Sequence, residues 1–238
     1  MPEKRVEPTS AIGTGYTESK WIVEEILHKF SDQAGLPTTV VRLGQVCGDK
    51  LGHWNEKEWF PALVKSSLFT RCLPGDMGEV SVHICFLRSQ TEYVSNYLQI
   101  AFILSYPAAR AFVEMRKSSS RVFHLVHPRP VKSKAIMEPI ASELGVPLVS
   151  YPEWLSKLEE CAREGSADEV DGMRANPALR LLDFFRAHHD GGSSNPGPRL
   201  STAEAERASQ ELELMRELSE EDAKRWVAAW HVSGFLSA

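Results

Sequence analysis

The sequence has 238 residues, a hydrophobic fraction of 42% and a formal net charge of −5, which together predict one large domain or two small ones with a sizeable core. The charge is mildly negative and no stretch clusters Lys and Arg with aromatic residues, so we expect no nucleic-acid partner. Its four cysteines, Cys47, Cys72, Cys85 and Cys161, are scattered without metal-ligand spacing, which indicates free thiols in a reducing compartment and no metal site.

The first segment, residues 1–14, is rich in Pro, Ser, Thr and Gly and is predicted to be an irregular lead-in. It lacks the apolar core of a secretory signal. The most apolar window, residues 98–104, is too short to span a bilayer. We therefore expect a soluble, cytoplasmic protein with no membrane partner.

An amphipathic helix follows, beginning near Gly15. Its apolar residues recur at helical spacing and are expected to pack against the core, namely Val23, Ile26, Leu27 and Phe30. Tyr16 and Lys20 lie four residues apart at its start, which places both side chains on one face. Because an ammonium stabilises a phenolate, a rigid pair of this kind suits proton transfer to a carbonyl. The spacing alone also arises by chance in ordinary helices.

A buried strand is predicted next, over residues 38–43, because the run is β-branched and follows the helix-ending Gly35 and Pro37. Residues 44–48 form the turn at its carboxyl end, where ligands bind in doubly wound folds. A plain strand-to-loop turn is an equal alternative. Trp54, Trp59 and Phe60 come before a helix over 62–67 and can line an apolar pocket or act as core aromatics.

The second half of the chain alternates predicted helices and strands. A helix runs from residue 108 to 117, a buried strand over 121–128, a helix over 136–144, a short strand over 146–149 and a helix from 151. His124 and His127, within the longer strand, are expected to be structural.

Three helix starts are predicted after residue 175. Asn176 and Pro177 are expected to cap a helix that carries Phe185. Capping boxes are expected at Ser201 with Glu204 and at Ser219 with Asp222, the last before a helix with Trp226 and Trp230 one turn apart.

The string Gly15-Tyr16-Thr17-Glu18-Ser19-Lys20-Trp21, followed by Val40-Val41-Arg42-Leu43-Gly44-Gln45, resembles the extended short-chain dehydrogenase/reductases of the thioester-reductase type. Such domains close fungal adenylating, carrier-bearing reductases similar to non-ribosomal peptide synthetases. The ending, residues 226–236, is also similar to theirs. The resemblance implies an α/β fold: an incomplete Rossmann-like, doubly wound parallel sheet, of which this is the second half. It also implies a division into residues 1–150 of the nucleotide-binding domain and a helical, substrate-side region over 151–238.

The resemblance also implies the site and its ligands. Tyr16 and Lys20 would be catalytic and would contact NADPH together with three residues at the end of the strand, Leu43, Gln45 and Val46. The aromatic trio Trp54, Trp59 and Phe60 would line an acyl pocket. The implied substrate is an acyl thioester on a phosphopantetheine arm, reduced to an aldehyde or an alcohol, and adenylation or carrier domains are the implied partners.

Residues 80–99 interrupt the family pattern, in which Gly78-Glu79 would run directly into Ile100 and the residues after it. The segment can be encoded by a stretch opening GTGAGT and closing CAG, with a CTAAC branch sequence across Val94-Ser95-Asn96. We interpret it as a retained intron translated in frame; the alternative is a genuine loop insertion. Sequencing the transcript across Glu79 and Ile100 decides between them.

The sequence contains no strand, glycine-rich turn and helix of the kind that holds a pyrophosphate. We therefore expect an exposed apolar edge, marginal stability, a tendency to aggregate and little turnover by the chain alone. Two other functions stay open. One is a non-catalytic module that binds a partner, such as a separately encoded upstream reductase half. The other is an epimerase-like extended dehydrogenase/reductase.

Overall fold

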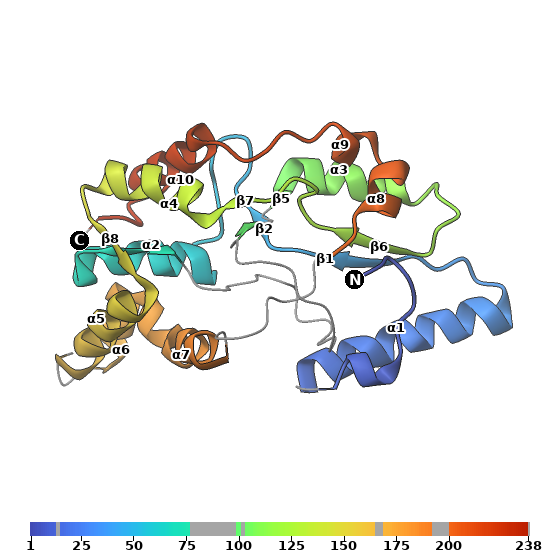
Figure 1. Ribbon diagram of the computed structural model, residues 1–238, viewed down its shortest axis with the longest axis horizontal. Helices are drawn as coiled ribbons and strands as arrows, with labels where there is room; N and C mark the ends of the chain where they lie inside the picture. Colours follow the sequence, from blue (N-terminus) through green and yellow to red (C-terminus); the bar gives the residue numbers. More distant parts are fainter. Residues whose placement is uncertain (13–14, 77–98, 101–102, 165–168, 192–199, 238) are drawn as a thin grey trace.

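The computed structural model describes residues 1–12, 15–76, 99–100, 103–164, 169–191 and 200–237. Most of the suspected insert, residues 80–98, and Cys85 lie outside these ranges. The described chain is a mixed α/β structure with a wide, two-part outline (Figure 1). No helix within the described ranges is long and apolar enough to cross a membrane.

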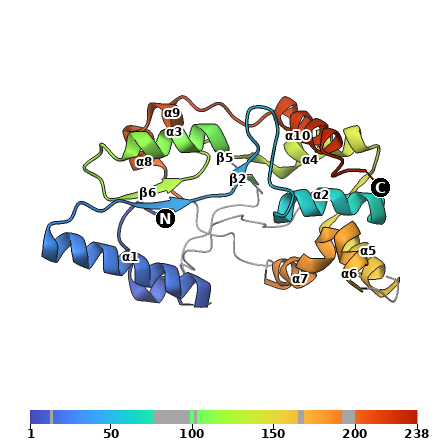
Figure 2. The same ribbon diagram turned by 180° about the vertical axis from the view of Figure 1, so that it is seen from behind.

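Two parallel strands form the centre of one part. They are β1 (Val40–Leu43) and β6 (Val122–Leu125), and Arg42 pairs with His124 in their register. Helix α1 (Gly15–Ala34) lies on one face of the pair, and α3 (Ser105–Met115) and α8 (Ala203–Ala208) lie on the other (Figures 1 and 2). Every residue of β6 is buried, which confirms the predicted strand and its covering on both faces.

Three further strand pairs are short. β2 (Val46–Cys47) runs parallel to β5 (Ile103–Leu104), and β3 (Leu73–Asp76) runs parallel to β8 (Leu148–Ser150). β4 (Gln99–Ile100) runs antiparallel to β7 (Val131–Lys132). The strand predicted over 146–149 begins two residues later, at Leu148, although the helix before it ends at Leu144 as predicted, with Gly145 next at φ of +64°.

The other part is mostly helical. It contains α2 (Trp59–Thr70), α4 (Ser133–Leu144), α5 (Tyr151–Glu164), α6 (Glu169–Ala175), a 3₁₀ segment η2 (Pro177–Leu181), α7 (Leu182–Gly191) and α10 (Glu220–Val232). Their apolar faces meet in a core rich in large aromatics, including Trp154, Phe185, Trp226 and Trp230. The Tyr151 hydroxyl donates to the Phe185 carbonyl oxygen at 3.1 Å and joins α5 to α7.

A second, smaller core lies between the β1–β6 pair and the helices on its α3 side, and contains Ile103, Met115, Phe123 and Leu212, the last from α9 (Gln210–Glu213). Each of the two cores takes residues from both sides of residue 150. Packing therefore crosses residue 150, and the division into 1–150 and 151–238 stays a prediction.

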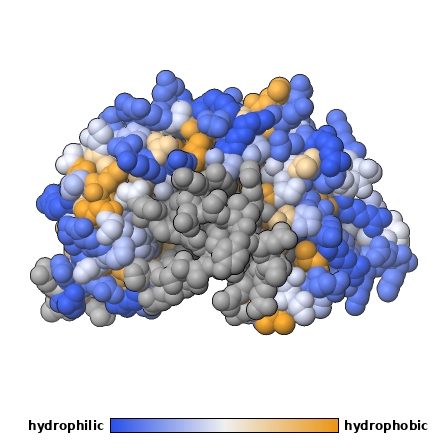
Figure 3. All heavy atoms as spheres, viewed as in Figure 1, coloured by the Kyte–Doolittle hydropathy of each residue, from blue (hydrophilic) through white to orange (hydrophobic). Residues whose placement is uncertain are grey.

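The predicted packing of the apolar face of α1 is wrong in the described structure. Val23, Ile26 and Phe30 are 53%, 47% and 55% exposed, whereas Glu24 and His28 are buried. Because Glu24 pairs with a buried arginine of β1, the helix turns a polar face inward and an apolar face outward. Hydrophobic residues accordingly appear among polar ones on the surface over α1 (Figure 3). This exposed apolar face of α1 is a different surface from the predicted apolar edge of the sheet, which stays a prediction.

The predicted caps have different outcomes. Asn176 does precede a helical segment that starts at Pro177, but this segment is the 3₁₀ turn η2 and the Asn176 side chain makes no hydrogen bond to another described residue. At α8 the Glu3 carboxylate takes the place of a capping box: it accepts from the amides of Glu204 and Ala205 at 2.6 and 3.1 Å. Burial raises the pKa of Glu3, and these backbone hydrogen bonds oppose the rise. The capping box of Ser219 with Asp222 is confirmed.

The first residues of the chain and three cysteines complete the fold. 3₁₀ segment η1 (Pro8–Ser10) precedes α1. Cys47, Cys72 and Cys161 are free thiols, as predicted. Burial raises the pKa of the Cys47 thiol well above its usual range, so this cysteine is an inert core residue.

Candidate active site

Tyr16 and Lys20 lie one turn apart at the start of α1, as their spacing predicts. The Lys20 Nζ atom is 5.3 Å from the centroid of the Tyr16 ring. Tyr16 is 56% exposed and Lys20 is also exposed, so both polar groups can reach a ligand. The Thr17 hydroxyl donates to the Ala11 carbonyl oxygen at 2.9 Å and fixes the chain as it enters the helix.

A buried ion pair anchors this helix to the sheet. Arg42 of β1 donates from Nε and Nη2 to the two carboxylate oxygens of Glu24 at 2.9 and 2.8 Å, and its side chain is 2% exposed. Such a two-point contact fixes orientation as well as distance. The Arg42 Nη1 atom lies 3.1 Å from His124 Nε2, and His124 Nδ1 lies 2.9 Å from the Ser201 carbonyl oxygen. With Nδ1–H as donor and Nε2 as acceptor, one tautomer satisfies both contacts.

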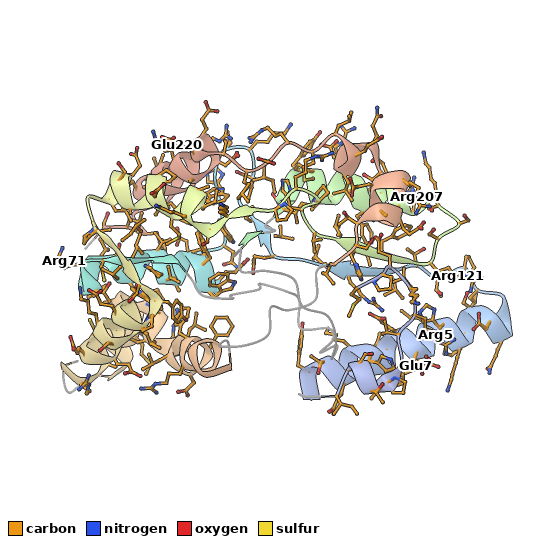
Figure 4. All side chains as sticks on the ribbon, in the orientation of Figure 1. Arg5, Glu7, Arg71, Arg121, Arg207 and Glu220 are labelled. Carbon is orange, nitrogen blue, oxygen red and sulfur yellow. The ribbon has the colours of Figure 1, made fainter. Side chains whose placement is uncertain are left out.

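Two partly exposed arginines, one before α1 and one before β6, also contact the same helix. Arg5 binds Glu25 and lies 3.6 Å from Asp32, while Arg121 donates to Ser31 at 2.7 Å. Figure 4 shows Arg5 and Arg121 beside α1. Because these groups are largely solvated, they add little stability, and the buried Glu24 pair carries the attachment.

The turn after β1 is held by close packing. A Cβ on Gly44 would lie 2.7 Å from a methyl carbon of Val126, so only glycine fits there. Leu43, just before this glycine, is 44% exposed, and the two residues after the glycine, Gln45 and Val46, are half-buried. The Gln45 carbonyl oxygen accepts from the Ile103 amide at 3.0 Å, which ties the turn to β5.

The Gln45 side chain also makes several hydrogen bonds. Its Nε2 donates to the Glu58 carboxylate and to the Val46 carbonyl oxygen, the latter at 2.8 Å. Its Oε1 accepts from the Trp59 indole at 3.0 Å. Gln45 is therefore placed next to an aromatic residue that the sequence assigned to the acyl side.

The aromatic trio occupies two environments. Trp54 is 6% exposed and Phe60 is fully buried, and their rings stack with centroids 5.0 Å apart. Trp226 packs edge-on against Trp54 at 5.1 Å, so both trio members belong to the aromatic core. This is the second of the two roles considered for them. Trp59 is half-buried, so of the three it is the one partly open to a ligand.

A separate groove of about 740 Å³ lies between α3 and α10, along the upper side of Figure 1, whereas α1 lies along the lower side. None of the predicted site residues lines it. Lys50 sits 3.9 Å above the Tyr106 ring, and Arg216 pairs with Asp222 at 2.6 Å. Burial works against ionisation of Asp222, but hydrogen bonds from Arg216, Ser219 and others lower its pKa to about 2. The charged side chains of Lys50 and Arg216 therefore connect neighbouring segments around the groove.

The structure thus forms two groups from the predicted site residues: Tyr16 with Lys20 on α1, and Gln45, Val46 and Trp59 at the end of β1. Sequence reasoning did not single out Glu24, Arg42 or Glu58. A charged residue inside the apolar run Val40-Val41-Arg42-Leu43 was the available signal for the buried pair.

The family model described as "Male sterility protein", an NAD-binding family, matches residues 3–96. An adenylate-forming reductase Nps10 of Heterobasidion annosum is 35% identical over 96% of this chain. A carboxylic acid reductase of Neurospora crassa is 26% identical over 97% of this chain. The chain spans about a fifth of the length of these relatives, 20% and 21%.

Solved structures share the fold. The terminal R domain of the myxalamid PKS-NRPS pathway superposes on all of this chain with a TM-score of 0.70 at 20% identity, and the chain covers 55% of that structure. The reductase domain of the aureusimine cluster gives a TM-score of 0.62 at 15% identity over 98% of this chain and 54% of that one. The predicted Rossmann-like α/β fold class is confirmed, with this chain matching about half of such a domain.

Proposed function

Because this chain belongs to the thioester-reductase family, we propose that it contributes the Tyr16/Lys20 helix to a domain that reduces a carrier-bound acyl thioester to an aldehyde with NADPH. The observation that carries the proposal is the pairing of a phenol and an ammonium, 5.3 Å apart, on an accessible helix face. The names of the relatives support reduction of carboxylic acid derivatives as the reaction class.

The residues present fit a reduced nicotinamide cofactor. Lys20 offers three donors, which suit ribose hydroxyls, and Tyr16 presents its hydroxyl on the same exposed face. Leu43 adds an exposed apolar side chain at the carboxyl end of β1, where ligands bind in such sheets. When bound, the cofactor would supply a hydride to the acyl carbon.

The chain's own residues would handle the oxygen of the thioester. Tyr16 would donate its hydroxyl proton to the carbonyl oxygen as negative charge develops there, and Lys20 would stabilise the resulting phenolate. The C–S bond of the resulting hemithioacetal then breaks while its hydroxyl proton passes to the sulfur, which releases aldehyde and the thiol of the phosphopantetheine arm, and the Tyr16 phenolate regains a proton from solvent. Reduction of the aldehyde to an alcohol would need a second hydride and a second proton.

Trp59 is the aromatic residue that we assign to the acyl side, because it is half-buried and hydrogen-bonded to the turn that carries Gln45. Trp54 and Phe60 would act behind it by fixing the core on which it rests. A carrier domain is the proposed partner, since the substrate is delivered on its arm.

Product analysis tests this function. The segment of the Neurospora crassa carboxylic acid reductase that matches this chain would be exchanged for residues 1–238, and the chimera supplied with its carrier-bound acyl thioester and NADPH. We expect aldehyde and free carrier thiol in equal amounts. Hydrolysis to the acid without NADPH consumption would contradict the proposal. For the isolated chain we expect little or no turnover, because the glycine-rich nucleotide turn of the family is not in its sequence.

A second candidate function rests on the apolar face of α1. Exposed Ile22, Val23, Ile26 and Phe30 would suit a non-catalytic role in which this chain binds a separately encoded reductase half. Co-expression with the matching upstream half of the Heterobasidion annosum relative distinguishes the two functions. A complex without NADPH oxidation would favour the binding role, and a complex with oxidation would favour the catalytic one.

A further inference from the structure

Glu58 immediately precedes α2, and its carboxylate binds two side chains that come from different segments. The Nε2 atom of Gln45 donates to Glu58 Oε2, and the Trp54 indole donates to the same oxygen at 3.1 Å. The Trp59 indole donates to Gln45 Oε1 at 3.0 Å. A continuous chain of hydrogen bonds therefore runs from Trp59 through Gln45 and Glu58 to Trp54.

The chemistry of these groups permits only one arrangement of the Gln45 amide. An indole N–H can only donate and a carboxylate can only accept, so Oε1 must face Trp59 and Nε2 must face Glu58. The remaining Nε2 proton is used as well, because it is donated to the Val46 carbonyl oxygen at 2.8 Å. The half-buried side chain thus has its donors and its acceptor engaged at once.

The two partners of Glu58 in this chain of hydrogen bonds are each attached to a rigid part of the fold. The Gln45 backbone is fixed by the Ile103 amide of β5. Trp54 stacks on Phe60 and packs edge-on against Trp226, inside the aromatic core. The Glu58 carboxylate therefore connects the turn after β1 to the helical part of the molecule.

We propose that Glu58 is a positioning residue, which fixes the turn over residues 44–46 against Trp59 and so sets the spacing between the cofactor side and the acyl side of the site. The cofactor part of this inference rests on the proposed function. Glu58 acts through Gln45 and the two indoles; its own carboxylate is occupied by them.

Nuclear magnetic resonance of the ¹⁵N-labelled 238-residue chain tests the positioning role without any ligand. The variants are Glu58→Ala, the more conservative Glu58→Gln, and Lys57→Ala as a control at an exposed neighbour. In Glu58→Ala we expect new shifts for the Gln45 side-chain amide and for both indoles, Trp54 and Trp59. Hydrogen exchange at the Trp59 indole should quicken about tenfold, the loss expected for one hydrogen bond. Glu58→Gln should give smaller changes in the same direction, and Lys57→Ala none.

The inference is overturned if Glu58→Ala moves only the Trp54 indole and leaves the Gln45 and Trp59 signals where they were. Thermal unfolding of each variant shows whether a spectral change reflects loss of the whole fold. If Glu58→Ala is unfolded, the shifts of the Gln45 and Trp59 signals in Glu58→Gln decide the inference instead. Titration of the chimera described under Proposed function with NADPH separates the two proposals. A chimera carrying residues 1–238 that does not bind NADPH contradicts the proposed function, while the ligand-free spectra of the 238-residue chain still decide the role of Glu58. If the chimera binds NADPH, Glu58→Ala within it should weaken the binding several-fold, about the effect of one lost hydrogen bond.

Discussion

The ammonium of Lys20 lies 5.3 Å from the centre of the Tyr16 ring, one turn further along α1. Helix geometry alone sets this distance, because residues four apart lie on the same face. The direction in which the pair points is set elsewhere, by the buried contact between Glu24 on the same helix and Arg42 of β1. The site therefore depends on an ion pair that touches neither of its polar groups.

Breaking that ion pair should destabilise the fold. Glu24→Gln leaves the Arg42 guanidinium buried without its counter-charge, which should lower the free energy of unfolding by about 3–5 kcal/mol. The double variant Glu24→Leu/Arg42→Met removes both charges and should recover most of the loss. Urea denaturation measures both. Glu25→Gln, at the exposed contact with Arg5, is the control, and its free energy of unfolding should not differ measurably from that of the wild type. A Glu24→Gln free energy of unfolding equally close to that of the wild type would contradict the anchoring role.

Acid should unfold the protein partly through His127. Burial lowers the pKa of this histidine from 6.5 to about 4, and its Nε2 atom lies 2.9 Å from the Arg216 carbonyl oxygen. Between these two values the unfolded chain binds a proton that the folded chain does not. Stability should therefore fall as the pH drops from 6.5 to 4, by up to about 3 kcal/mol from this residue.

The contribution of His127 is isolated by comparing pH series of urea denaturation. His127→Gln should flatten the slope between pH 6.5 and 4. An identical slope in the wild type and in His127→Gln would contradict this assignment.

The aromatic trio should separate into core and surface roles. Phe60→Ala creates a cavity beneath Trp54 and should cost about 3–5 kcal/mol of stability, since Phe60 is fully buried. Trp59→Phe keeps most of the ring area and loses only the hydrogen bond to Gln45, so it should cost no more than about 1 kcal/mol. Differential scanning calorimetry gives both values. A Phe60→Ala variant as stable as the wild type would return Phe60 to a pocket-lining role.

The apolar face of α1 should make the isolated chain self-associate. Ile26→Ser and Phe30→Ser replace side chains that are 47% and 55% exposed, so the folded monomer should change in stability by no more than about 0.5 kcal/mol. The associated fraction in sedimentation velocity should fall in both. Lys29→Ser, on the same helix, serves as the control. Unchanged association in the two apolar variants would show that this face is not responsible.

Local sequence patterns predicted much of the fold. The β-branched run that ends at Leu43 and the run that ends at Leu125 are parallel neighbours, as expected of strands buried on both faces. The spacing of Tyr16 and Lys20 also predicted correctly that their side chains lie together, because this placement depends only on helix geometry. The orientation of α1 could not be predicted this way, since an amphipathic pattern shows which face is apolar and not whether this chain covers it.

Contacts between distant segments were likewise out of reach. The Glu3 carboxylate caps α8 some two hundred residues away, at the amides of Glu204 and Ala205, so no local capping signal could have indicated it. Glu58 was overlooked for the same reason: its two partners are indole and amide groups brought to it by the fold. The sequence pattern indicated Ser201 with Glu204 because such a pattern shows only neighbouring residues and not a distant partner such as Glu3.

The most direct measurement is the single-turnover rate of NADPH oxidation by the chimera that carries residues 1–238, with its acyl thioester bound. Tyr16→Phe removes the proposed proton donor and should slow this step by a factor of about 10² to 10⁴, the usual range for general acid catalysis. Tyr106→Phe makes the same chemical change on α3 and should leave the rate unchanged. Equal rates in Tyr16→Phe and in the unsubstituted chimera would contradict the assignment of Tyr16 and Lys20 as the working pair.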